Sequence, residues 1–76
     1  MMDKLRSMAV FVGVVESGSF SAAADALNIS AVMVGKHIAQ LEALLGVRLL
    51  ERTTRKHSLT SAGANYYDNC KKVLEQ

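Results

Sequence analysis

The sequence predicts a small, mainly α-helical domain with three helices, two short strands and a final helix. Three observations predict it: apolar residues repeat at helical spacing, capping and turn residues separate the repeats, and a short basic stretch lacks helical periodicity. The 76 residues suffice for one domain with a modest core. Because 50% of the residues are hydrophobic, the composition excludes a disordered chain.

The first helix is predicted from Asp3 to Glu16, with Asp3 as its N-cap. Its apolar residues keep helical spacing over three turns: Leu5, Met8, Phe11, Val12 and Val15. The β-branched residues from Val10 to Val15, interrupted by Gly13, leave a buried strand as the alternative. We favour the helix because the spacing extends further than a short strand. Gly18 then ends it in a left-handed conformation.

A short alanine-rich helix, a turn and a longer amphipathic helix follow. The short helix is predicted over residues 22–27, capped by Ser19 or Ser21, and the turn contains Asn28, which tolerates left-handed backbone. Ser30 caps the longer helix, which runs to Leu45 and carries its apolar stripe at Val34, Ile38, Leu41 and Leu45. This order is the helix-turn-helix arrangement, whose second helix enters the major groove of DNA.

The face of this longer helix opposite the stripe contains no carboxylate. It carries only small or apolar groups and one cation: Val32, Lys36, Ala39 and Ala43, with Gly35 to one side. Most solvated helix faces are richer in Glu, Lys and Gln. A face with small side chains and no anions can approach a polyanion closely, so it indicates a DNA-reading surface.

A basic two-stranded wing is predicted after Gly46, which ends the longer helix. Its strands lie within the ranges 47–52 and 56–60 and are joined by a loop at residues 53–55. Between Arg48 and His57, four cations (Arg48, Arg52, Arg55 and Lys56) accompany one carboxylate, Glu51, which gives a local charge of +3 (4 − 1). That balance indicates a phosphate contact.

The final helix is predicted from Ser61 to Gln76, with Thr60 as its cap. Tyr66, Cys70 and Val73 lie along one side of it. So short a chain leaves this stripe no other large partner, and we therefore expect it to pair with a second copy of the chain. The chain stops within this helix, which indicates a fragment.

The residues that match a known family occur in order along most of the chain. They are Ala23-Ala24, Leu27, Ser30, Val34, Ile38, Leu41-Glu42, Leu45-Gly46-Val47, Leu49-Leu50-Glu51-Arg52, Leu59-Thr60 and Ala62-Gly63. From about Leu5 to Gly63 the chain resembles the N-terminal DNA-binding domain of LysR-type transcriptional regulators. The resemblance implies a winged helix-turn-helix over residues 1–60, a linker and dimerisation helix over 61–76, and an effector-binding C-terminal domain that this chain lacks.

Sequence-specific binding of double-stranded DNA as a dimer, with higher oligomers possible at full length, is the function this resemblance implies. The predicted DNA-binding residues are Ser30, Ala31, Val32, Gly35, Lys36, His37, Arg52, Thr53 and Arg55. The predicted dimerisation residues are Tyr66, Cys70 and Val73. The family often has hydrogen-bonding residues where this chain has Ala31, Val32 and Gly35, so the resemblance does not imply which bases are recognised.

Each DNA-binding residue type has a chemical reason. Lys36 can donate to guanine, and Ala31 and Val32 can pack on a thymine methyl. Ser30 and the free amides beside it can bind a phosphate. Arg55 suits the minor groove. Two residues have alternative roles. Arg52 contacts the DNA backbone or pairs with Glu42 or Glu51. His37 contacts DNA or packs on the first helix.

Other functions find little support in the sequence. Cys70 is the single cysteine, which excludes a disulfide within the chain and fits a cytoplasmic protein. The longest apolar run is too short to span a membrane, and neither metal-ligand spacing nor a catalytic constellation is present. We therefore expect no enzyme, metal or cofactor in this chain, and a small-molecule effector only on the missing domain. The alternative function is a protein-interaction module that docks through Val32, Met33 and Val34.

Overall fold

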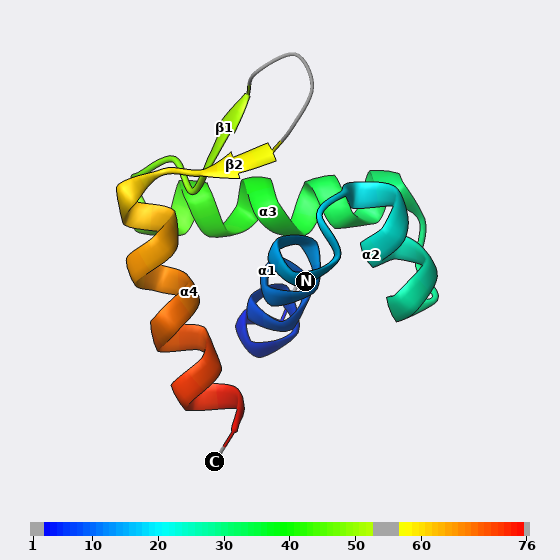
Figure 1. Cartoon of the computed structure of the whole chain (residues 1–76), viewed down its shortest axis with the longest axis horizontal. Coiled ribbons are helices and arrows are strands. Elements are labelled where there is room, and N and C mark those ends of the chain that lie inside the picture. The colour runs from blue at the N-terminus through cyan, green and yellow to red at the C-terminus, as the bar shows by residue number, and fades with distance from the viewer. Residues whose placement is uncertain (1–2, 53–56, 76) are drawn as a thin grey trace.

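Four helices and a two-stranded antiparallel sheet make up the part of the chain that the computed structural model describes, residues 3–52 and 57–75 (Figure 1). In chain order the elements are α1 (Lys4–Ser17), α2 (Phe20–Leu27), α3 (Ala31–Leu45), β1 (Leu50–Arg52), β2 (His57–Leu59) and α4 (Ser61–Leu74). The strands pair in the register Leu50↔Leu59, Glu51↔Ser58 and Arg52↔His57. The predicted fold class is confirmed, and the strand alternative for the first segment is wrong.

Each helix begins at a side-chain cap that accepts a hydrogen bond from a backbone amide of the first turn. Asp3 caps α1, and Ser19 caps α2, which decides between Ser19 and Ser21. Ser30 caps α3 and Thr60 caps α4. Replacing such a cap by alanine typically costs about 1 kcal/mol. These short polar residues therefore fix where the helices begin.

Left-handed residues end the first three helices where the sequence predicts. Gly18 has φ 86°, Asn28 has φ 60° and Gly46 has φ 70°. Asn28 is the one described non-glycine residue with positive φ, and its amide donates to the Ala24 and Asp25 carbonyls at the end of α2. Each of these residues ends its helix, and Asn28 does so within the short connection between α2 and α3.

α1 is the centre of the fold, since α2, α3 and α4 all pack against it. The buried apolar core comprises Met8, Val10, Phe11, Val12, Val14, Ala23, Ala24, Val34, Ile38, Leu41, Leu49, Leu50 and Cys70. Leu5 differs from expectation, because this residue, in the first turn of α1, is 52% exposed. A helix buried on several sides carries apolar residues around its circumference, as residues 10–15 do.

α4 packs on its own chain, which corrects the predicted dimerisation stripe. The Tyr66 ring lies 5.8 Å from the Phe11 ring, centroid to centroid, and Cys70 is fully buried in the core. Tyr66 is partly buried, whereas Val73, at 47% exposure, is the most accessible of the predicted set, and Leu74 is exposed beside it. α4 therefore contributes to the same apolar core as α1, α2 and α3.

Candidate nucleic-acid interface

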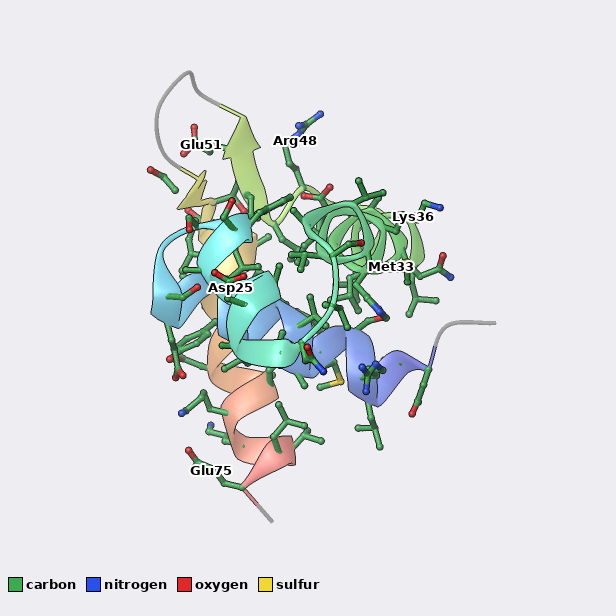
Figure 2. The ribbon with its side chains drawn as sticks, turned by 90° about the vertical axis from the view of Figure 1, so that its right-hand side faces the viewer. Asp25, Met33, Lys36, Arg48, Glu51 and Glu75 are labelled. Atoms are coloured by element: carbon green, nitrogen blue, oxygen red, sulfur yellow. The ribbon has the colours of Figure 1, made fainter. Side chains whose placement is uncertain are left out.

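The two sides of α3 differ as the sequence predicts. Val34, Ile38 and Leu41 are buried against the core. On the opposite side Val32 is 68% exposed, and Lys36 and Ala39 are exposed as well. Figure 2 shows Lys36 pointing away from the body of the domain. We call the exposed surface formed by Ala31, Val32, Lys36 and Ala39 the open face of α3.

The start of α3 presents backbone donors beside this open face. The Ser30 hydroxyl accepts from the Met33 amide at 3.1 Å, and the Val34 amide donates to the Ser30 carbonyl. The first amides of a helix have no intrahelical acceptor, and the helix dipole makes this end partly positive. Ala31 and Val32 are exposed here, so their backbone can approach an anion such as a phosphate.

Three exposed cations accompany α3 without a carboxylate partner among residues 3–52 and 57–75. They are Lys36 on α3, Arg48 between α3 and β1, and Arg6 on α1. Lys36 and Arg48 both point outward from the domain (Figure 2). Lys71, by contrast, forms ion pairs with Glu16 and Glu75, on the α1–α4 side. The cations near α3 are therefore available to an external anion.

His37 does not belong to the open face, and its predicted DNA contact is withdrawn. The residue is only 3% exposed, and its Nδ1 lies 2.7 Å from the hydroxyl of the fully buried Ser7 on α1. Burial lowers the pKa of His37, with a smaller contribution from the positive charge of Arg6. The ring therefore favours its neutral form and packs on the first helix, which is the alternative that the sequence left open.

Gly35 lies beside the open face, at the crossing of α2 and α3. A Cβ at this position would meet the Phe20 ring at 3.5 Å, an ordinary van der Waals distance. Ala31, by contrast, is exposed at the start of the helix. Gly35 therefore lies at the contact between the two helices of the motif, and it flanks the surface that the other predicted residues form.

The predicted wing residues are only partly described. Arg52 lies in β1 opposite His57 in β2, and its side chain is not described. Thr53 and Arg55 lie outside the described residues, so their predicted contacts stay predictions. The carboxylate of Glu42 accepts from the amides of Leu49 and Leu50 at 2.9 and 3.3 Å. This carboxylate attaches the start of β1 to the end of α3.

Two residues of α1 escaped the sequence analysis. Ser7 precedes Phe11 by four residues and Val14 by seven, so its spacing places it on the buried stripe of the helix. A hydroxyl at such a position signals a buried hydrogen bond and was the available sign of the contact with His37. No comparable signal singles out Arg6, because its nearness to α3 depends on how the helices pack.

Within residues 3–52 and 57–75, no three side chains of His, Cys, Asp or Glu gather in a way that would hold a metal ion. None of the helices described combines the length and apolar character needed to cross a bilayer.

Comparison with known proteins identifies residues 5–64 as matching the family described as "Bacterial regulatory helix-turn-helix protein, lysR family". An HTH-type transcriptional repressor of Pseudomonas aeruginosa is 53% identical over 75 residues, which are 99% of this chain and 24% of the relative. The HTH-type transcriptional activator AaeR of Escherichia coli is 44% identical, again over 99% of this chain and 24% of the relative. The chain thus spans about a quarter of the length of these relatives.

Solved structures of DNA-binding domains in complex with DNA have the same fold. The DNA-binding domain of BenM with catB site 1 DNA matches with a TM-score of 0.90 and 40% identity, over 97% of this chain and 78% of that one. The DNA-binding domain of CbnR in its DNA complex also has a TM-score of 0.90, with 38% identity over 97% and 84% of the two chains.

Proposed function

Because the chain belongs to the LysR family of bacterial regulatory helix-turn-helix proteins and is a DNA-binding domain of that family, we propose that it reads double-stranded DNA by laying α3 in the major groove. The open face of α3 carries this proposal. Its side chains are small, apolar or cationic, and it has no carboxylate that would repel phosphates. The buried stripe on the other side holds the helix firmly on the core.

The residues of the open face take different roles in this proposal. Lys36 donates to guanine O6 or N7, while Ala31 and Val32 pack on thymine methyl groups. Ser30 and the neighbouring amides bind a phosphate. Arg52, Thr53 and Arg55 of the wing contact the DNA backbone and the adjacent minor groove. A preference for DNA rich in A and T follows from the apolar start of α3, with part of it arising from DNA shape.

Replacing Lys36 by alanine tests the direct contact. The loss of one well-placed cation should weaken binding to a duplex selected from a random pool by about 1–3 kcal/mol, and less on other duplexes. A phosphate contact would instead weaken binding to all duplexes alike. It would also reduce the slope of log affinity against log salt concentration by about 1. Titrations of both duplexes at several salt concentrations separate these outcomes.

Lys72→Ala is the matched control for this prediction. Lys72 is also an exposed lysine, but it lies on α4, away from α3. Its removal should leave the affinity for the selected duplex nearly unchanged. Equal affinities for the parent and the Lys36→Ala variant would contradict the assigned role of α3. Capture of a protein partner, without any salt-sensitive DNA binding, would favour the interaction-module alternative.

A homodimer formed through the end of α4 is the partner arrangement that we propose. Val73 and Leu74 are exposed there, although Tyr66 and Cys70 are occupied within the chain. Val73→Asp should shift the chain toward monomer in sedimentation, because a carboxylate in an apolar interface loses its hydration. Asn69→Asp, an exposed change on the same helix, should not. A parent chain that sediments as a monomer at high concentration would contradict the dimer.

The regulator to which this domain belongs is proposed to act in the cytoplasm and to respond to a small-molecule effector. The relatives are about four times as long as this chain, which leaves room for an effector domain in a protein of that length. We propose that the effector binds in such a domain and that the residues described in this chain hold no cofactor.

A further inference from the structure

The strongest unassigned feature is a buried polar pair between α1 and α3. The Ser7 hydroxyl and Nδ1 of His37 are 2.7 Å apart, and the two residues are 0% and 3% exposed. Thirty positions separate them in the chain. Either the hydroxyl donates to an unprotonated Nδ1, or a protonated Nδ1 donates to the hydroxyl oxygen. In both cases one hydrogen bond with a defined direction connects α1 to α3.

Among the described residues, Ser7 and His37 are the buried polar ones, and the other buried residues that α1 and α3 contribute are apolar. Val34, Ile38 and Leu41 of α3 belong to the same buried cluster as the apolar residues of α1. Apolar burial is non-directional, and cores tolerate rearrangement of such side chains while volume is kept. A hydrogen bond has a narrow range of distance and angle. The polar pair therefore restricts sliding and rotation of α3 in a way that the apolar contacts do not.

The position of His37 makes this restriction relevant to recognition. It directly follows Lys36 and lies four residues after Met33, within the half of α3 that carries the open face. Hydrogen bonding to a base edge needs the donor placed within about 0.5 Å. A small slide of α3 on α1 would thus misplace Lys36 without unfolding the domain.

We propose that the Ser7–His37 pair is a positioning device that fixes α3 on α1 and thereby sets the ability of the domain to discriminate between DNA sequences. The pair does not touch DNA itself. This inference rests on the proposed function, since it assumes that α3 reads bases. Buried polar pairs that contribute little net stability but define a unique arrangement are known in other folds.

The test compares three replacements of the pair. His37→Asn keeps a hydrogen-bonding atom near the place of Nδ1, His37→Leu removes it, and His37→Asn combined with Ser7→Ala removes its partner. Ser17→Ala is the control, since its hydroxyl bonds only to carbonyls at the end of α1 and the following turn. For each protein the affinity for a duplex selected by the parent chain is divided by the affinity for a scrambled duplex.

We expect His37→Asn and Ser17→Ala to keep the parental ratio within about threefold, which is less than 1 kcal/mol. His37→Leu should lower it about tenfold while affinity for the scrambled duplex stays unchanged. If His37→Leu does not fold by circular dichroism, the comparison between His37→Asn and the double variant decides in its place. Ratios that remain equal among folded variants overturn the positioning role. A parent chain without any preference between duplexes overturns the proposed function itself.

Discussion

Replacement of Val32 by aspartate is expected to reduce DNA affinity by about 100-fold or more, the largest effect of any single change on the open face. Val32 is 68% exposed, so the variant should fold like the parent. In the groove, however, the new carboxylate would lie among phosphates that repel it, and it would lose its hydration. The apolar contact to a thymine methyl would also be lost. Fluorescence anisotropy with a labelled duplex measures this loss.

Asn65→Asp is the control for added charge. It also places one carboxylate on an exposed helical position, but on α4. Its effect on affinity should be limited to long-range repulsion, which is largely screened at physiological salt. If Val32→Asp bound as tightly as Asn65→Asp, α3 would not enter the groove by its open face, whatever its family.

The buried and exposed sides of α3 could be predicted from the sequence because its capping residues and its apolar spacing agree. A serine cap, an apolar stripe at helical spacing and a terminal glycine all assign the same boundaries, and the structure has them at Ser30 and Gly46. The side opposite the stripe also has no second set of large apolar residues, which is typical of a helix that exposes this side. The open face follows from these features without knowledge of the other helices.

The partner of α4 could not be predicted in the same way. The stripe containing Tyr66 and Cys70 shows that α4 packs on an apolar surface. It does not indicate whether that surface belongs to the same chain or to a second copy. The helical spacing predicted one apolar stripe on α1, whereas α1 is buried against three helices. That error left α4 without a partner in the chain. Likewise, the burial of His37 depends on Ser7 of α1, a contact across thirty positions.

Gly63→Ala is expected to be the most destabilising small substitution in the domain. A Cβ at this position would collide with the carbonyl oxygen of Leu49, a backbone atom that cannot rotate away. The same carbonyl accepts from the Thr60 amide at 3.1 Å, so the first turn of α4 lies directly on the chain before β1. Relief would require α4 to move off the core that contains Cys70. We expect a loss of about 3 kcal/mol or more in the free energy of unfolding.

Gly35→Ala provides the matched comparison, because the same methyl group is added to another helical glycine. Its nearest neighbour would be the Phe20 ring at 3.5 Å, a distance that needs no movement. Alanine favours helix over glycine by about 0.5–1 kcal/mol, so this variant should be slightly more stable than the parent. Urea unfolding of both variants measures the change in the free energy of unfolding, which we expect to be a loss for Gly63→Ala and a small gain for Gly35→Ala. Equal destabilisation by both variants would mean that the added methyl group in a helix, and not the contact with Leu49, lowers the free energy of unfolding. The first turn of α4 would then not lie directly against the Leu49 carbonyl.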